Sequence, residues 1–150
     1  MAITSAGILL FRRTTELEIF AGHMGGPFWA KKSEQSWSVP KGIYTDDEEP
    51  LAAALREFAE EIGTEPPAAN YSLLGEYRQA SGKRLTVFAA ESDFTFDTLS
   101  SNTFELEWPP RSGKLQQFPE LDEARWLTLD DARVKLVKGQ LAMLDDLTER

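Results

Sequence analysis

The sequence predicts an α/β fold in which helices cover both faces of one mixed β-sheet. Two observations lead to this prediction. Strand-like apolar segments stand before and after a strongly amphipathic helical segment, and a second helical segment lies near the C-terminal end. The chain also has 150 residues, of which 41% are hydrophobic, and this suits one domain with one sizeable core. We therefore expect residues 1–150 to form a single domain.

The expected strands are apolar segments separated by polar turns, at residues 6–11, 17–21, 71–79, 85–91, 103–108 and 126–127. Residues 37–39 form a short apolar segment that ends at Pro40. Residues 85–91, with the sequence L-T-V-F-A-A-E, are apolar on both faces, so we expect this strand near the centre of the sheet. Residues 80–83 form the turn before it. Residues 41–49 and 109–117 are polar and are expected as loops.

The main helix is expected to begin at Pro50, whose missing N–H costs nothing in a first turn, and to stop at Gly63. Its core-facing residues recur at spacings of four, three and four, as Leu51, Leu55, Phe58 and Ile62. A second helical segment begins with a cap at Thr128 and is interrupted at Gly139.

Charge and composition exclude several classes of function. The chain carries 16 basic and 25 acidic residues, a formal net charge of -9, which argues against a broad electrostatic grip on nucleic acid. The absence of cysteine excludes disulfides, thiolate metal sites and a cysteine nucleophile. No apolar segment is long enough to span a bilayer, and the first residues lack the features of a signal peptide. We expect a cytoplasmic protein without membrane or nucleic-acid partners.

Three glutamates share one face of the main helix. Glu57, Glu60 and Glu61 are spaced three and four apart, or adjacent, within the segment R-E-F-A-E-E-I-G-T. Two carboxylates about 6 Å apart repel by roughly 3 kcal/mol at an effective dielectric constant of about 20. Solvent screening removes most of this repulsion on an exposed face, and a divalent cation would convert it into attraction. The triplet alone leaves both interpretations open.

The surrounding residues favour the cation. Residues 42–64 read G-I-Y-T-D-D-E-E-P-L-A-A-A-L-R-E-F-A-E-E-I-G-T and resemble the Nudix box, Gly-x5-Glu-x7-Arg-Glu-U-x-Glu-Glu-x-Gly-U, where U is a bulky aliphatic residue. Thr64 departs from the pattern at the last aliphatic position. The matching residues are Gly42, Glu48, Arg56, Glu57, Glu60, Glu61 and Gly63. The resemblance implies a Nudix-like α/β/α sandwich and a pyrophosphohydrolase that requires Mg²⁺ or Mn²⁺.

The resemblance also implies roles for the residues of the box. Glu57 and Glu61 would bind the metal directly, Glu60 would bind it directly or through water, and the Gly42 carbonyl would contribute. Arg56, counted with the catalytic residues, would pair with Glu48 to brace the loop and orient the ligands. Without such a role, Arg56 and Glu48 would form an ordinary surface ion pair of little energetic value.

An acidic residue outside the box is expected to complete the site. Glu120 stands six residues before Trp126, a spacing similar to that in Nudix diadenosine polyphosphate hydrolases. It would serve as an additional metal ligand or as the general base. The alternative is an exposed loop carboxylate without a function.

Several side chains outside the acidic group are candidates for substrate binding. Cations expected near the phosphates are Lys41, Arg78, Lys83, Arg111 and Lys114, each of which is otherwise an ordinary solvated charge. His23, the single histidine, would line the mouth of the site or cap a strand end. Aromatic residues that would stack on a base are Phe28, Trp29 and Tyr77.

The favoured function is hydrolysis of a diphosphate linkage in a nucleoside di- or polyphosphate derivative by attack of water on phosphorus. A dinucleoside polyphosphate or a nucleoside triphosphate is the preferred substrate. The alternative is a catalytically inactive nucleotide-binding sensor with the same fold. Removal of pyrophosphate from RNA 5′ ends is disfavoured by the acidity of the chain. The sequence leaves open whether the protein is a monomer or a homodimer.

Overall fold

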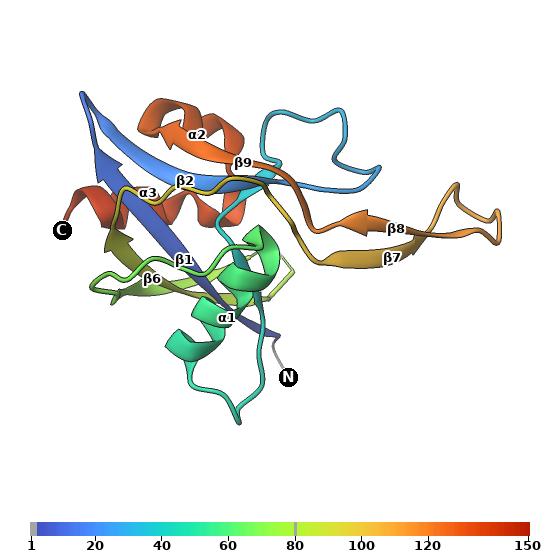
Figure 1. Cartoon of the computed structure of the whole chain (residues 1–150), viewed down its shortest axis with the longest axis horizontal. Coiled ribbons are helices and arrows are strands. Elements are labelled where there is room, and N and C mark those ends of the chain that lie inside the picture. Colours follow the sequence, from blue (N-terminus) through green and yellow to red (C-terminus); the bar gives the residue numbers. More distant parts are fainter. Residues whose placement is uncertain (1–2, 80) are drawn as a thin grey trace.

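The computed structural model describes residues 3–79 and 81–150. Its centre is a seven-stranded sheet, shown in Figure 1. The strands of this sheet are β1 (Thr4–Arg13), β2 (Leu17–Met24), β3 (Trp37–Ser38), β4 (Lys41–Ile43), β5 (Ser72–Arg78), β6 (Arg84–Glu91) and β9 (Leu121–Thr128). They are arranged in the order β3-β2-β1-β6-β5, with β4 also paired to β1 and β9 to β2. The β1–β6 pairing is parallel and the other pairings are antiparallel, so the sheet is mixed as predicted.

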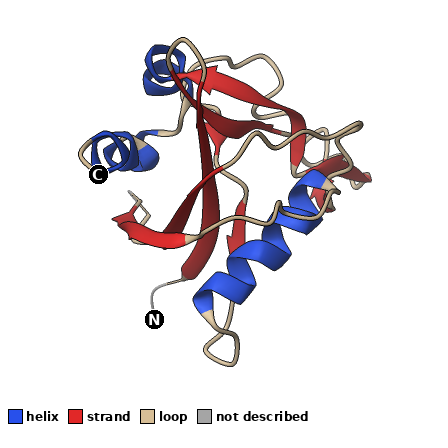
Figure 2. Ribbon diagram, turned by 60° about the vertical axis from the view of Figure 1, so that its left-hand side comes forward, coloured by secondary structure: helices blue, strands red, loops and turns tan. Residues whose placement is uncertain are grey.

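Helices cover both faces of this sheet, as Figure 2 shows. One face packs against α1 (Pro50–Ile62), and the other packs against α2 (Leu129–Lys135) and α3 (Ala142–Thr148). A short 3₁₀ helix, η1 (Lys138–Gln140), connects α2 to α3. The predicted α/β/α sandwich is therefore the observed architecture.

Strand β1 explains why the sheet needs cover on both sides. Its side chains alternate between two separate cores, because successive residues of a strand point to opposite faces. Ile8 and Leu10 belong to the core beneath α1, whereas Leu9 belongs to the core beneath α2 and α3. All three are fully buried, and burying each one contributes roughly 1.5–3 kcal/mol.

Helix α1 begins and ends as its sequence predicts. Pro50 occupies the first turn, and Gly63 adopts a left-handed conformation with φ of 80°, donating its N–H to the carbonyl of Ala59 at 2.8 Å. Phe58 and Ile62 are fully buried against the sheet. This docking fixes the rotation of the helix, and so it fixes the direction of the glutamates between the buried positions.

Three predicted segments were wrong in part. Residues 41–49 are not all loop, because β4 pairs with β1. Residues 109–117 are not all loop either, since β7 (Thr103–Glu107) and β8 (Leu115–Pro119) form a two-stranded hairpin that projects from the body of the molecule in Figure 1. Strand β9 is longer than the predicted residues 126–127. These segments mix polar and apolar residues without a clear strand pattern, and they are held by backbone pairing.

Other predicted details are confirmed. Strand β6 lies between β1 and β5, inside the sheet. The Thr128 hydroxyl caps α2 by accepting the N–H of Asp131 at 3.2 Å, and Gly139 lies in the break between α2 and α3. The predicted turn at residues 80–83 includes Ala80, which is outside the described residues. Within residues 3–79 and 81–150, no helix combines the length and hydropathy needed to cross a bilayer.

Candidate metal and phosphate site

A cavity of about 650 Å³ is lined by residues from the sheet and from the helical layers on both of its faces. Its lining includes residues from α1, from β4, from the turn between β5 and β6, from η1 and from the junction between β8 and β9. Its charged lining residues are Lys41, Glu57, Glu61, Lys83, Arg84, Glu120 and Lys138. The same space is therefore bordered by acidic and basic side chains.

Glu57 reaches the cavity across the backbone of β4. A Cβ atom placed on Gly42 would lie 1.9 Å from Oε2 of Glu57, so only glycine leaves room for this carboxylate. Strand β4 is held in place by antiparallel pairing to β1, in which Gly42 lies opposite Ala6. The glycine and the glutamate of the box are thus in direct contact, although 15 positions separate them in the sequence.

Glu61 is the most deeply placed carboxylate of the site. It is 7% exposed, and its Oε1 atom accepts the backbone N–H of Lys41 at 3.1 Å. Burial, together with the carboxylates of Glu120 and Glu57, raises the pKa of Glu61 to about 7, although the Lys41 ammonium and N–H lower it. Among the described residues, no basic side chain lies within ion-pair distance of Glu61. A buried carboxylate surrounded in this way is suited to binding a cation.

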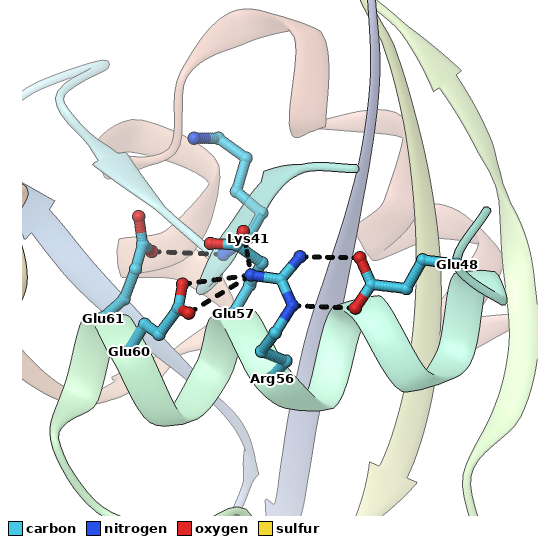
Figure 3. A network of polar contacts seen from close by, with 6 residues as sticks. All are labelled: Lys41, Glu48, Arg56, Glu57, Glu60 and Glu61. Carbon is cyan, nitrogen blue, oxygen red and sulfur yellow. Dashed lines mark hydrogen bonds and ion pairs between the residues drawn. The ribbon is translucent and has the colours of Figure 1, made fainter. Parts of the chain in front are cut away.

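Arg56 connects three carboxylates, as Figure 3 shows. Its Nε and Nη2 atoms donate to the two oxygens of Glu48 at 2.7 and 2.8 Å, a bidentate arrangement. Its Nη1 atom donates to Glu57 at 2.9 Å and to Glu60 at 3.1 Å. The hydrogen bond from Arg56 lowers the pKa of Glu48, and the hydrogen bond to Glu48 raises the pKa of Arg56. The predicted Arg56–Glu48 pair is present and extends to two of the candidate ligands.

Glu60 lies differently from its two neighbours. Its side chain is 38% exposed and borders a shallow depression with Arg56 and Glu65, outside the main cavity. In this arrangement Arg56 engages both Glu57 and Glu60, and the backbone of Lys41 engages Glu61. The described residues accordingly contain no group of three or more acidic or histidine side chains already close enough together to hold a metal ion.

The donor set nevertheless fits a hard divalent cation. Three carboxylates, Glu57, Glu61 and Glu120, line one cavity, and oxygen ligands of this kind are those that Mg²⁺ prefers. The contact of Glu57 with Gly42 leaves no side chain between that carboxylate and the β4 backbone. Burial raises the pKa of Glu57, while the Arg56 guanidinium lowers it, so a cation would relieve desolvation at both Glu57 and Glu61.

Glu120 is brought to the site by backbone contacts on both sides of its own residue. Its N–H donates to the carbonyl of Asn102 at 2.7 Å, and its carbonyl accepts the N–H of Gly25 at 2.9 Å. It lies between β8 and β9, at the base of the hairpin. The structure therefore brings it into the same cavity as Glu57 and Glu61.

The predicted cations divide into two groups. Lys41 and Lys83 line the cavity. Arg78, Arg111 and Lys114 are exposed and are not among the cavity residues. Arg111 and Lys114 follow β7 into the tip of the hairpin, where pairing of β7 with β8 carries them away from the body of the molecule.

Of the aromatic candidates and the histidine, one lines the cavity and the others lie elsewhere. Trp29 lines the cavity, whereas Phe28 is 59% exposed and packs edge-on against Trp108 with ring centroids 5.4 Å apart. Tyr77 is buried in the core beneath α2 and α3, so it is not available to stack on a base. His23 is not a lining residue of this cavity. Its ring nitrogens lie 2.7 Å from the carboxylate of Asp122 and 2.7 Å from the carbonyl of Lys32.

Sequence reasoning missed Arg84 and Lys138, which both line the cavity. Arg84 is the first residue of β6 and Lys138 is the first residue of η1. Neither belongs to a local motif, and no spacing in the sequence links either one to the box. Only the topology of the sheet brings them to the glutamates.

Comparison with known proteins gives matches in sequence and in fold. Residues 1–147 match the family model described as "NUDIX domain". Over 40 residues the chain is 50% identical to an RNA pyrophosphohydrolase of Thioalkalivibrio sulfidiphilus (strain HL-EbGR7), a match that covers 26% of this chain and 23% of that protein. The matched segment thus spans about a quarter of that relative.

Solved structures share the fold. The C. elegans Ap4A hydrolase, in a binary complex, is 19% identical with a TM-score of 0.67, and the similarity covers 99% of this chain and 96% of that chain. The NUDIX domain of NrtR from Shewanella oneidensis, complexed with ADP ribose, is 16% identical with a TM-score of 0.64, covering 100% and 88%. Together with the box and its geometry, the match along residues 1–147 shows that this chain belongs to the Nudix family.

Proposed function

We propose that this protein hydrolyses a diphosphate linkage in a nucleoside di- or polyphosphate derivative, with Mg²⁺ or Mn²⁺ as cofactor. One observation carries the proposal: the carboxylates of Glu57, Glu61 and Glu120 and the ammonium groups of Lys41 and Lys83 border the same cavity. A polyphosphate chain is polyanionic, so it requires cations on all sides. The lysines supply part of that charge, and metal ions held by the carboxylates would supply the rest.

Glu57, Glu61 and Glu120 would hold the metal, with the Gly42 carbonyl as a further oxygen donor. When bound, the metal neutralises phosphate charge, lowers the pKa of a water molecule and orients that water for attack. Glu120 is exposed at the cavity and acts as an additional ligand or as the general base. Glu60 contributes from outside the cavity, through Arg56 or through water.

Arg56 would act by positioning. It donates to Glu48, Glu57 and Glu60 at once, so it ties the loop before α1 to the helix face that carries the ligands. Its guanidinium also offsets the mutual repulsion of Glu57 and Glu60 when no metal is bound. The cost of assembling the acidic face is thereby reduced before a cation arrives.

The substrate classes that we favour are dinucleoside polyphosphates and nucleoside triphosphates. Two of the compared proteins are named for Ap4A hydrolysis and for RNA pyrophosphohydrolysis. Both reactions cleave chains of several phosphates that are joined to nucleosides. A cavity of about 650 Å³ with Trp29 in its wall has room for such a chain and a stacked base.

A substrate panel tests the proposal. Purified protein would be incubated with Mg²⁺ and with dinucleoside polyphosphates, nucleoside triphosphates, ADP ribose or an RNA with a 5′ triphosphate, and the phosphate-containing products would be measured. We expect turnover of at least one of the first two classes, and loss of that turnover by orders of magnitude in Glu61→Gln. Glu16→Gln, a change of an exposed glutamate in the β1–β2 turn, is the matched control.

The same panel separates the alternatives. Tight nucleotide binding without turnover of any compound would favour the inactive sensor and overturn the proposal. Preferential turnover of the RNA would retain the chemistry but replace the substrate class. Equal activity of Glu61→Gln and Glu16→Gln would refute the metal assignment.

A further inference from the structure

Lys138 is a positively charged residue of the cavity wall that does not belong to the box. Lys138 is the first residue of η1, on the sheet face that is opposite to α1. The carboxylates of Glu57 and Glu61 enter the cavity from α1, on the other face. Lys138 and these two glutamates therefore approach the same space from different layers of the sandwich.

The segment that carries Lys138 is attached to β3 by backbone hydrogen bonds. The N–H of Val137 donates to the carbonyl of Trp37 at 2.9 Å, and the N–H of Ser36 donates to the carbonyl of Lys135 at 2.9 Å. Leu136 also forms an isolated bridge with Trp37. These contacts precede η1 and fix where it begins.

A buried side chain fixes the other end of η1. Gln140 is fully buried, its Oε1 accepts the N–H of Val39 at 3.1 Å, and its Nε2 donates to the hydroxyl of Ser38 at 2.8 Å. The Ser38 hydroxyl in turn donates to the carbonyl of Val39 at 2.8 Å. A fully satisfied buried network of this kind is rigid, because breaking one bond leaves a buried polar group without a partner.

The remaining side of η1 packs against the end of β5. A Cβ atom on Gly139 would lie 3.1 Å from Cγ and 3.3 Å from Cα of Gln79, so the two backbones are already close. Gln79 also leads into the turn that carries Lys83. Lys138 and Lys83 therefore come from adjacent segments, and both line the cavity.

The ammonium group of Lys138 forms no ion pair within the described part of the chain. No carboxylate of those residues lies within ion-pair distance of its ammonium, and the side chain is exposed at the cavity. In a chain of net charge -9, an unneutralised lysine on a rigid support beside a cavity is suited to an anionic ligand. The support matters, because a segment whose backbone is already ordered loses less conformational entropy on binding.

We propose that Lys138 binds a phosphate group of the substrate other than the one next to the carboxylates, and thereby favours chains of three or more phosphates over shorter ones. This inference rests on the proposed function for the identity of the cavity as the phosphate site. It adds Lys138, a residue from the opposite layer of the sandwich, as the residue that makes binding depend on the number of phosphates. The glutamates and Lys41 serve the phosphate under attack, and Lys138 serves a more distant one.

Binding of non-hydrolysable probes tests this inference separately from catalysis. Dissociation constants would be measured by calorimetry with Mg²⁺, at one fixed ionic strength, for an adenosine triphosphate analogue with methylene groups in place of both bridging oxygens and for adenosine monophosphate. We expect Lys138→Gln to weaken triphosphate binding by about tenfold or more, as the loss of a charge-assisted hydrogen bond does, and to change monophosphate binding less than about twofold. Lys138→Arg should retain most of the triphosphate affinity.

Arg13→Gln provides the control for the lost charge. Arg13 is exposed at the end of β1, eight residues from Ser5 at the cavity, or about 26 Å along an extended strand. It should leave both affinities within about twofold of the unmodified protein. Equal losses for both probes in Lys138→Gln, or no loss for either, would overturn the inference. Since these probes are not hydrolysed, the result stands apart from the turnover panel, and a protein that binds the triphosphate without hydrolysing anything would contradict only the proposed function.

Discussion

The carboxylate of Glu57 rests against the α-carbon of Gly42, so closely that a methyl group on that glycine would lie 1.9 Å from Oε2. This contact joins the short strand β4 to helix α1 at the candidate metal site. It explains in steric terms why a glycine stands at the start of the box. It also makes the site sensitive to a change that removes no charge.

Gly42→Ala is therefore expected to impair the site while the fold survives. The atoms in the way are the far end of a flexible side chain, so the Glu57 carboxylate can move aside. A ligand displaced by about 1 Å can cost on the order of 100-fold in rate. Turnover and the Mg²⁺-induced rise in melting temperature would both be measured. Unchanged values of both would show that Glu57 is not a ligand.

Arg56→Lys is expected to separate activity from stability. Lysine cannot make the bidentate contact with Glu48 while also reaching Glu57 and Glu60. The Arg56 side chain is 40% exposed, so the stability lost with these contacts should stay below about 1 kcal/mol. Turnover should fall by about 10–100-fold, as it does when groups that orient metal ligands are changed. Denaturant unfolding and steady-state kinetics would be compared, and normal turnover would exclude the positioning role.

The pH dependence of stability should report the protonation of Glu61. Its folded-state pKa of about 7 lies above the ordinary value of 4.5, so the folded state retains a proton that the unfolded state releases. Without a divalent cation, the stabilisation is complete below about pH 4.5 and is lost as the pH rises through about 7. Mg²⁺ requires the carboxylate, so its stabilising effect should increase over the same range.

Melting temperatures with and without Mg²⁺, measured from about pH 5 to about pH 8, would check both trends. In Glu61→Gln the titrating group is gone, so the pH profile should be flatter and the effect of Mg²⁺ smaller. A Mg²⁺ effect that is independent of pH in the unmodified protein would contradict this account.

Tyr77→Phe should affect stability and leave catalysis intact. The Tyr77 hydroxyl donates to Asp146 at 2.7 Å and so ties β5 to α3. Its removal should cost about 1 kcal/mol of unfolding free energy. Because the ring lies in the core and not in the cavity, KM and kcat should stay near their original values. A large increase in KM would instead place Tyr77 in contact with substrate.

The parts of the molecule that the sequence predicted well are those with local signals. Pro50, the stripe ending at Ile62, and Gly63 determine α1 within 14 residues, and the box residues gather on that helix, on β4 and on the loop between them. Glu120 was predicted from its spacing to Trp126, and the structure brings it to the cavity.

The parts that could not be predicted depend on distant pairing. Strand β4 and strand β8 are short segments of mixed polar and apolar residues, and their strand character comes from their partners, β1 and β7. Arg111 and Lys114 were expected at the phosphates, but the hairpin carries them elsewhere. Lys138 becomes a cavity residue only after η1 docks on β3, a contact across about 100 positions of the chain.

The hairpin of β7 and β8 has a practical consequence. Glu120 is held at its base by Asn102 and Gly25, whereas residues 110–114 form the exposed tip. Changes of length at the tip should therefore leave the position of Glu120 unchanged. The tip offers a place to attach a fluorophore or an affinity tag that reports on the protein without touching its chemistry.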